Sequence, residues 1–573
     1  MTAILDRPAR VLPPPEPRKR SEEPHVQGDA WPSWLMFGVS FIAYVTVGAV
    51  LAVRYGYIVG DALSRTADAS FATNSQDPHL SAIGFVFGPL PTVAQIPVQL
   101  FANWWPDITR YGISGIVVSS AFMAGFLVQL ALTIRDRGAS RLWSFGIAAI
   151  VGLLPMIVLY GANGMSEAPF LFFTMWAVRR LIRWQRTDDV HDLTAAGLAV
   201  GLCYLVRYEA LVIGVMGVVV IVLRHRVRGW KLNKATMDSS ILLMPLAITF
   251  AFWTGASWLI TGDAFAQFSS VYGNSAVLAQ SRSGSSSVAV SFPIIETLVL
   301  SPLLPLIAIV SFGLAIRRRD IDLLPVLLIF GAVLGFEAVS VIRGSTFPFL
   351  RYYVLAIPAT ALLLAFLRPG RGGLEARRAG PEALPPRTGA LPGGVSRILT
   401  SLAVVVGLIA PVPVTLRLMD SATRAPQEYY LKAIFDRRGA SDGALSVLRT
   451  FGTERGFAAY LDRLDLPDSS VLVDTSSGFA IVAASLRRKQ FVITSDHNFV
   501  RDLNDPSEYG IQYILAVPDT GRGTADAINR RYPTMYDTGA DVAHLAFVVP
   551  QTAANQLPWR LYRVNAGGGS GAH

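Results

Sequence analysis

Residues 34–53 read WLMFGVSFIAYVTVGAVLAV, a run of 20 residues that carries no charge. An α-helix needs about 20 apolar residues to cross the ~30 Å hydrocarbon core of a bilayer, so this stretch predicts a transmembrane helix. The composition agrees, since 52% of the 573 residues are hydrophobic and 16% are charged, against about 25% charged in a typical soluble domain. These figures exclude a disordered, fibrous or ordinary cytosolic protein and indicate a polytopic membrane protein.

Ten further apolar runs follow, and together they predict about eleven transmembrane helices. The predicted spans are 34–53, 111–134, 142–160, 167–183, 193–206, 208–223, 239–260, 294–316, 323–342, 351–367 and 397–416. Residues 82–104 are also apolar, but they contain Pro89, Pro91 and Pro97. Because proline breaks helices, we expect this stretch to be a re-entrant or interfacial segment.

The distribution of Lys and Arg predicts the orientation, because cytoplasmic loops are enriched in these residues. Basic segments lie at the N-terminus and at 135–141, 179–186, 224–231, 317–319 and 368–397, whereas loops 161–166, 261–293 and 343–350 carry few cations. This pattern predicts a multi-pass plasma-membrane protein with a cytoplasmic N-terminus, disordered over residues 1–30. Arg supplies 45 of the 50 basic residues, a bias typical of GC-rich bacterial genomes.

After about residue 420 the composition changes, and short β-like runs alternate with helical ones. The predicted strands are 471–475, 490–494, 513–518, 543–549 and 559–564, and the predicted helices are 478–488 and 524–532. This alternation predicts a small extracytoplasmic α/β domain over 421–566 with a mainly parallel sheet, then a flexible tail over 567–573. No Gly-rich phosphate fingerprint follows any of these strands. The single cysteine, Cys203, excludes an intrachain disulfide.

The first outer loop, 54–104, holds several candidate functional residues. Asp61 and Asp68 are seven residues apart, so a helix over 61–70 would place them on one face. A carboxylate at the membrane–water boundary can act as general base for a hydroxyl acceptor. Alternatively, Asp61 pairs with Arg65 and Asp68 is solvated. Asp77 and His79 follow, and for His79 a hydrogen-bonded structural role is the simpler alternative to metal ligation.

Other candidates lie at the outer ends of later spans. Glu167 starts the fourth span. An ionisable residue near membrane depth is usually functional; the alternative is that the helix dipole simply favours a carboxylate at the start of a helix. Arg207 and Glu209 lie together between two short spans and could simply pair. Arg343 and Arg351 lie at the two ends of the outer loop 343–350, and Tyr352 follows. Guanidinium groups at this position are suited to bind a phosphate. The alternative is that they extend to the lipid headgroups.

Four short motifs occur in order over residues 34–420. They are Gly60-Asp61, then Asp77-Pro78-His79-Leu80 with Gly88-Pro89-Leu90-Pro91, then Tyr160-Gly161…Ser166-Glu167-Ala168-Pro169, and finally Arg351-Tyr352…Pro358. This order resembles the GT-C superfamily of integral-membrane glycosyltransferases, in particular the branch of the protein mannosyltransferases and aminoarabinose transferases. The chain departs from that pattern in having Asp61-Ala62 where Asp-Glu is common, and in an altered His-Pro-Pro-Leu segment.

The resemblance implies transfer of a sugar from a polyprenyl-phosphate carrier to a glycan, lipid or protein acceptor on the outer face, with inversion at the anomeric carbon. It implies that Asp61 is the base or orients the acceptor hydroxyl, and that Glu167 and Asp68 support the acceptor or a cation. Arg207, Arg343 and Arg351 would then stabilise the departing lipid phosphate, whose charge grows in the transition state. The carboxylates could hold a divalent cation, Mg²⁺ or Mn²⁺, although the pattern does not require one.

Two other classes of function stay open at this point. A transporter or flippase of lipid-linked sugars would show internal repeats and mid-span polar groups, whereas here the ionisable residues cluster at span ends. A non-catalytic membrane scaffold would use the outer α/β domain to recruit partners. The identity of the sugar and the acceptor depends on loop shape, which the fold does not determine. Nothing in the pattern indicates nucleic-acid binding.

Overall fold

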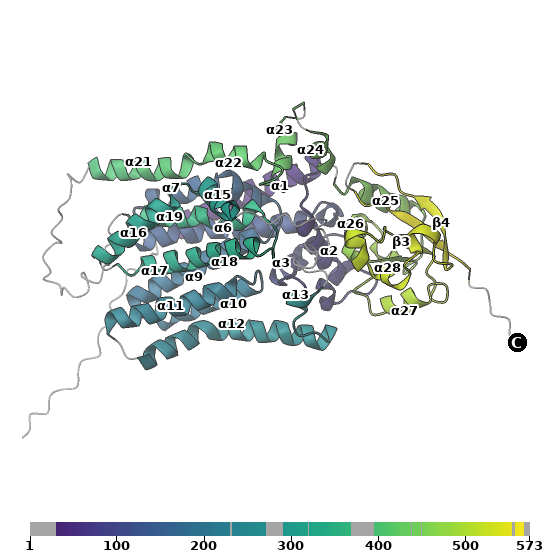
Figure 1. The fold of residues 1–573 in the computed structure, drawn as a ribbon, viewed down its shortest axis with the longest axis horizontal. Helices are drawn as coiled ribbons and strands as arrows, with labels where there is room; N and C mark the ends of the chain where they lie inside the picture. Colours follow the sequence, from purple (N-terminus) through teal and green to yellow (C-terminus); the bar gives the residue numbers. More distant parts are fainter. Residues whose placement is uncertain are drawn as a thin grey trace, which may run out of the picture.

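A computed structural model describes residues 30–229, 232–270, 290–318, 320–367, 395–436, 438–439, 441–448, 450–552 and 556–566. The predicted disordered N-terminus, most of the Arg-rich loop 368–397 and the predicted tail lie outside these residues. The described chain forms a long helical bundle with a small α/β domain at one end (Figure 1). We call that end of the bundle the domain end.

The bundle contains a helix in each of the eleven predicted spans. Its elements are α1 (Ala30–Ala49), η2 (Val50–Arg54), α6 (Ile113–Asp136), α7 (Arg141–Gly152), α8 (Pro155–Ala162), α9 (Glu167–Thr187), α10 (Val190–Tyr204), α11 (Ala210–Arg228), α12 (Leu232–Thr261), α15 (Ser291–Leu300), α16 (Leu304–Arg318), α17 (Leu323–Pro325), η4 (Val326–Phe330), α18 (Gly331–Ile342), η5 (Leu350–Tyr353), α19 (Ala356–Phe366), α21 (Val395–Ile409) and α22 (Val412–Met419). Apolar side chains such as Val39, Phe252 and Ile309 point outward and are more than half exposed. Such a belt suits contact with lipid.

Within the described residues, six helical segments are long and apolar enough to cross a membrane, or eight if each of two bent pairs is one span. The predicted count of about eleven is therefore not confirmed. α10 and α19 are short apolar helices, and α9 carries four arginines in its second half. The bent pairs are α7–α8, with an angle of 73°, and α15–α16, with an angle of 78°. Pro155 and Pro302 lie at the two breaks, where a helix cannot continue without losing a hydrogen bond.

Helix α1 packs closely on the rest of the bundle. A Cβ atom at Gly48 would lie 2.2 Å from the Ala162 carbonyl oxygen of α8 and 2.5 Å from the side chain of Ile116 on α6. Only glycine allows this approach, since any larger residue would force the helices apart. The first predicted span is therefore fixed against α6 and α8.

The described basic segments at 135–141, 179–186, 224–229 and 317–318 gather at one end of the bundle, opposite the α/β domain. Arg137, after α6, contacts Asp320 at 2.6 Å and Asp322 at 3.0 Å, in the segment before α17. Arg186, at the end of α9, also contacts Asp322. These pairs are largely buried, so the arginines that mark this end also join its loops.

The segment between α1 and α6 is built from short helices. They are α2 (Gly60–Asn74), η3 (Leu80–Ile83), α3 (Leu90–Val93), α4 (Ile96–Gln99) and α5 (Asp107–Arg110). Among them, η3, at the start of the stretch 82–104, and α3 and α4, within it, have only four residues each, in keeping with the prolines there. Figure 1 shows α2 and α3 between the bundle and the α/β domain. The Leu90 N–H donates to the Leu205 carbonyl oxygen at 2.9 Å, which holds this segment against the α10–α11 turn.

A connecting region after the bundle contains α23 (Lys432–Phe435) and α24 (Asp442–Val447), and the α/β domain follows. Its elements are α25 (Gly452–Arg463), β1 (Val471–Val473), α26 (Thr475–Ala484), β2 (Phe491–Ile493), α27 (Phe499–Asn504), β3 (Tyr513–Ala516), α28 (Ala527–Arg531), α29 (Met535–Thr538), β4 (Ala543–Val548) and β5 (Arg560–Val564). The five strands match the five predicted ones, in the order β2-β1-β3-β5-β4.

The prediction of a mainly parallel sheet was wrong, because two of the four strand pairings are antiparallel. β1 pairs with β2 and β3 in parallel, whereas β5 is antiparallel to both β3 and β4. The cause is the connection between β4 and β5, which contains no described helix. A parallel neighbour needs a long crossover, usually helical, whereas a shorter loop returns the chain in the antiparallel direction.

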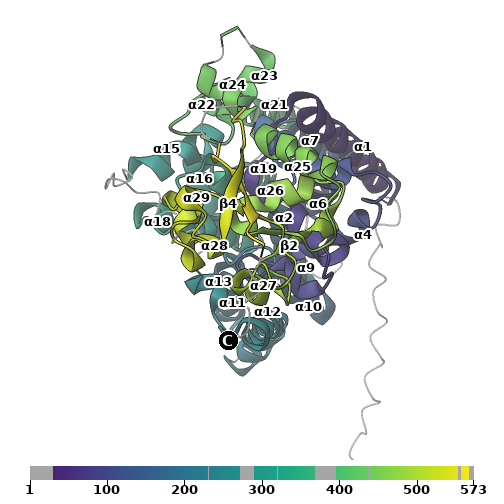
Figure 2. The ribbon, with the colours of Figure 1, turned by 90° about the vertical axis from the view of Figure 1, so that its right-hand side faces the viewer.

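The central strands are buried on both faces. Val471, Val473 and Phe491 point into an apolar cluster with α25 and α26, and Leu472 and Val492 point into a second cluster with α27 and α28. This alternation follows from the two-residue period of a strand. Figure 2 shows the two helix pairs on opposite sides of the sheet, in front of the bundle.

Helix α2 contributes to the first of these clusters. Ala67 and Phe71, both at most 1% exposed, pack with Val473 and Ile481 of the α/β domain. The core of the α/β domain therefore includes residues from the first loop, about 350 positions earlier in the chain than the predicted range 421–566.

Candidate active site

A cavity of about 280 Å³ lies at the domain end of the bundle. Its walls come from the start of α2, the start of α9, the turn between α10 and α11, the end of α18 and η5. The lining residues are Asp61, Arg65, Val86, Phe87, Gly88, Ser166, Glu167, Val206, Arg207, Tyr208, Glu209, Gln267, Phe268, Phe336, Glu337, Ser340, Ser345, Thr346, Arg351 and Tyr352. Six of the ten predicted site residues are among them: Asp61, Glu167, Arg207, Glu209, Arg351 and Tyr352.

Asp61 lies in the first turn of α2, which begins after Val59 in an extended conformation. A carboxylate in a first helical turn is stabilised by the partial positive charge of the helix N-terminus. Its side chain is 48% exposed, and Oδ2 accepts a hydrogen bond from Arg351 Nη2 at 3.1 Å. Asp61 is thus a carboxylate that is open to the cavity and oriented by an arginine.

Arg65, one turn further along α2, also lines the cavity. Its Nη1 donates to the Asp61 backbone carbonyl oxygen at 3.3 Å. Its side chain stacks at 5.4 Å on the ring of Phe87, which comes from the segment that packs against the α10–α11 turn. The predicted neighbour of Asp61 therefore contributes a third guanidinium to the site.

Glu167 lies between two arginines. It is the first residue of α9, and its side chain is only 2% exposed. Its Oε1 lies 3.1 Å from Arg207 Nη1 and 3.2 Å from Arg351 Nε. Its other oxygen, Oε2, is buried and has no hydrogen-bond partner within the described protein. A buried carboxylate oxygen without a partner is costly, so Oε2 is available to a group bound in the cavity.

Arg207 joins three carboxylates. It contacts Glu209 on the same turn, Glu167 of α9 and Glu337 of α18, the last at 3.1 Å. Burial disfavours its charge, but the carboxylates of Glu209, Glu337 and Glu167 outweigh burial and raise the pKa of Arg207 above its ordinary value. The guanidinium also stacks on Phe170 and Tyr352, at 5.2 and 5.0 Å from the ring centres. The group is therefore a permanent cation with a fixed position.

Arg351, in η5, connects the cavity to the region after the last helix of the bundle. Its Nη1 donates to Gln427 Oε1 at 2.6 Å. The neighbouring Glu428 accepts a hydrogen bond from Tyr160 of α8, and Tyr57 donates to the Gln427 carbonyl oxygen at 2.9 Å. These contacts hold the guanidinium of Arg351 between Asp61 and Glu167.

The other four predicted residues lie outside the cavity lining. Asp68 is on α2 but two turns beyond Asp61, and burial raises its pKa to about 8. Arg343 is exposed at the end of α18. Asp77 and His79 face the α/β domain, where Asp77 contacts His497. Distance along a helix accounts for Asp68, and the paths of the loops and the side-chain directions, which spacing alone does not fix, account for the others.

Sequence reasoning missed Glu337 and named Arg65 only as a partner. Glu337 lies in the apolar stretch GAVLGFEAVSVI of α18. An ionisable residue within a predicted span is usually functional, and that signal could have identified it. Tyr208 and Gln267 also line the cavity. The sequence did not distinguish them, because polar residues at helix ends are common.

The comparisons with known proteins concern the fold. No protein-family model matches the chain, and no curated protein matches its sequence. Among solved structures, ArnT from Cupriavidus metallidurans, bound to undecaprenyl phosphate, aligns with 94% of this chain and 99% of its own, with a TM-score of 0.52 and 14% sequence identity. The chain has the fold of ArnT. This likeness agrees with the fold that the four motifs imply.

Two structures of the Archaeoglobus fulgidus oligosaccharyltransferase align less well. The apo form matches 86% of this chain and 70% of its own, with a TM-score of 0.39 and 10% identity. The complex of AglB with an inhibitory peptide and a dolichol-phosphate matches 84% of this chain and 69% of its own, with a TM-score of 0.36 and 11% identity.

Proposed function

We propose that this protein transfers a sugar from a polyprenyl-phosphate donor to a hydroxyl of a glycan, lipid or protein acceptor at the outer face of the membrane. The observation that carries the proposal is the cavity in which Asp61, open to solvent, lies beside the fixed guanidinium groups of Arg351, Arg207 and Arg65. The ArnT fold supports it, because the solved ArnT structure is bound to undecaprenyl phosphate. The proposal places the N-terminus in the cytoplasm and the α/β domain outside.

In the proposed reaction the acceptor oxygen attacks the anomeric carbon and Asp61 takes the hydroxyl proton. A new bond forms between that oxygen and the anomeric carbon, and the bond from this carbon to the phosphate oxygen breaks. Polyprenyl phosphate leaves with the bonding electrons, and attack from the opposite side inverts the anomeric configuration. Asp61 suits the role of base because it is the half-exposed carboxylate, whereas Glu167 is held between two arginines.

The arginines would stabilise the leaving phosphate. Guanidinium groups that are already fixed need no reorganisation when negative charge grows on the phosphate oxygen. Arg351 and Arg207 are fixed by carboxylates and by the ring of Tyr352. Glu167 Oε2, which has no described partner, would accept from an acceptor hydroxyl or hold a divalent cation such as Mg²⁺ or Mn²⁺. The reaction as written does not depend on a cation.

The test is transfer of radiolabel from polyprenyl-phosphate mannose, arabinose and glucose to a membrane extract by the purified protein. We expect release of polyprenyl phosphate from one of these donors, and a decrease of about 10²–10⁴-fold in the Asp61→Asn variant. Asp107→Asn is the matched control, since Asp107 also lies in the first turn of a helix of this segment but outside the cavity lining.

Equal transfer by the wild type and Asp61→Asn would remove Asp61 from the mechanism. Movement of an intact donor across vesicles, without cleavage of the sugar–phosphate bond, would replace the transferase proposal with a flippase. Loss of activity in Asp107→Asn as well would indicate a folding defect, and thermal unfolding of both variants identifies that case.

A further inference from the structure

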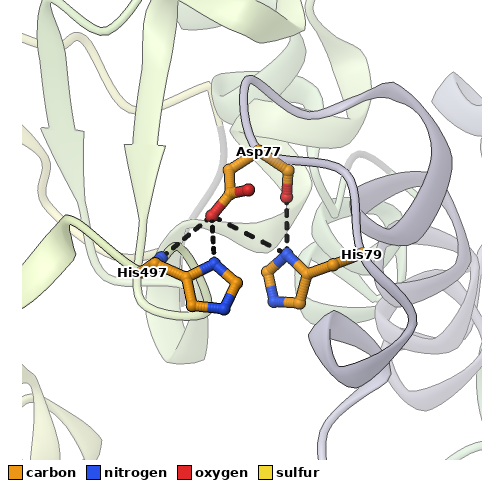
Figure 3. Close-up of side chains that lie close together, drawn as sticks. All are labelled: Asp77, His79 and His497. Carbon is orange, nitrogen blue, oxygen red and sulfur yellow. Dashed lines mark hydrogen bonds and ion pairs between the residues drawn. The ribbon is translucent and has the colours of Figure 1, made fainter.

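Three side chains that the proposed reaction does not use meet where the first loop contacts the α/β domain (Figure 3). Asp77 and His79 follow α2. His497 comes from the turn between β2 and α27, 420 positions after Asp77. The cluster contains two imidazole rings and one carboxylate, contributed by two distant parts of the chain.

The groups are close enough to share one ligand. His497 Nδ1 lies 2.6 Å from Asp77 Oδ2, and the His497 backbone N–H donates to the same oxygen at 3.0 Å. His79 Nδ1 lies 2.6 Å from the Asp77 carbonyl oxygen and 3.8 Å from Oδ2. The two rings are 4.5 Å apart, and one ligand atom from each residue lies within 4.8 Å of the other two.

The cluster is both held in place and open to solvent. Gln76 donates to Asp496 at 2.8 Å and to Asn498 at 2.9 Å, on either side of His497, and accepts from Ser469. The His497 side chain itself is 75% exposed. An ion could therefore reach the site, and the exposed ring can rotate to adjust its distance to the other ligands.

A purely structural role explains less of the arrangement. The Gln76 hydrogen bonds already fasten the first loop to the turn, and the His497 backbone N–H already satisfies Asp77. Neither ring is needed for this contact, yet both face the same carboxylate.

We propose that Asp77, His79 and His497 bind a divalent transition-metal ion, with Zn²⁺ as the best match. Two imidazole nitrogens and one carboxylate oxygen are a preferred ligand set for Zn²⁺, with water in the open position. Mg²⁺ and Ca²⁺ prefer oxygen ligands and are disfavoured here. The site is separate from the cavity, and a bound ion would join the loop after α2 to the α/β domain.

The test is Zn²⁺ binding to the full-length protein in detergent after treatment with a chelator and buffer exchange. We expect one Zn²⁺ per chain by metal analysis and calorimetry, and a rise in Tm on the order of 5 °C at saturation. His497→Ala and His79→Ala should each weaken binding by about 10-fold or more. Co²⁺ added instead should give visible absorption bands that the two variants lack.

His544→Ala is the matched control, since His544 is an exposed histidine of the same domain, hydrogen-bonded to Asn565 and outside the cluster. It should bind Zn²⁺ as the wild type does. Absence of binding up to about 1 mM Zn²⁺, or wild-type affinity in both cluster variants, would overturn the proposal. So would binding that is lost in Asp61→Asn and kept in His497→Ala, because the ion would then lie in the cavity. Zn²⁺ binding and the rise in Tm are measured without transferase activity, so the metal site can be confirmed or refuted independently of the proposed function.

Discussion

Arg351 is the residue that joins Asp61 and Glu167, two of the four carboxylates of the candidate active site. It contacts Asp61 through Nη2 and Glu167 through Nε, and it donates to Gln427 through Nη1. Only a planar guanidinium can reach three acceptors in different directions with a fixed geometry. The position of the proposed base therefore depends on this side chain.

Arg351→Lys should reduce transfer by about 10–100-fold, chiefly through a higher KM for the donor. The ammonium group of lysine keeps the positive charge but lacks the paired N–H donors with which a guanidinium binds a phosphate. Steady-state kinetics with the labelled donor measures this change. Arg343→Lys is the control, since Arg343 is exposed and outside the cavity lining, and its kinetics should stay within about twofold of the wild type. The opposite ranking would place the phosphate at the loop 343–350.

Asp68 provides a second prediction at this scale. Burial raises its pKa to about 8, whereas an unfolded Asp titrates near ~3.9. Between these pH values the folded protein keeps a proton that the unfolded chain has lost. The stability of the folded state therefore falls as the pH rises from about 4 to about 8.

Asp68→Asn removes this titration, so the variant should be more stable than the wild type at pH 8, by about 1 kcal/mol or more. The difference should shrink toward zero at about pH 4–5. Thermal unfolding of the wild type and the variant in detergent, compared at each pH across this range, measures it. A difference that is constant with pH would contradict the assignment.

At the scale of elements, the two ends of the bundle use buried ion pairs for different purposes. At the domain end the pairs surround a cavity and hold the candidate functional groups. At the opposite end they fasten loops, because Asp322 before α17 accepts from Arg137 at 3.0 Å and from Arg186 Nε at 2.7 Å. Removing one member of a buried pair leaves the other charge uncompensated.

Asp322→Asn should therefore destabilise the protein by about 3–5 kcal/mol while leaving transfer intact below the lowered Tm. The free energy of unfolding in detergent and the transfer assay measure the two effects. Asp189→Asn is a control at the same end, since Asp189 is exposed and caps α10. Asn caps a helix equally well, so the cost should stay below about 0.5 kcal/mol. A loss of transfer in folded Asp322→Asn would mean that this end also serves the reaction.

At the scale of the whole molecule, α2 links the site to the α/β domain. Its first turn carries Asp61, and ten residues later Phe71 is buried in the core of that domain. A shift of the domain would move the helix and the carboxylate together. We therefore expect the α/β domain to help position the proposed base, although none of its described residues lines the cavity.

Phe71→Ala should lower the free energy of unfolding by about 3–5 kcal/mol and also reduce transfer at temperatures where the protein stays folded. Phe499→Ala is the matched control, because Phe499 is buried in the cluster on the other face of the same sheet. It should cost similar stability and leave transfer nearly unchanged. Equal transfer by both variants would show that α2 is positioned by the bundle alone.

The sequence by itself determined the elements of this protein. Long apolar runs have few alternatives to a helix in lipid, because every backbone group must be hydrogen-bonded within the segment. Short β-like runs separated by helical stretches likewise predicted the five strands. Placing an ionisable side chain near the membrane costs free energy, so such residues are rare beside apolar runs and usually functional. For this reason the sequence alone indicated Asp61, Glu167, Arg207 and Arg351 as candidates.

Only the tertiary structure decided which candidates share a site. Arg351 reaches Asp61 across 290 positions of the chain, while Asp68, on the same helix as Asp61, lies outside the cavity lining. Arg65 and Glu337 enter the site, and Asp77 and His79 instead meet His497. β5 inserts beside β3 in the antiparallel direction. Such contacts depend on how helices pack and on where each side chain points, and neither is encoded in local spacing.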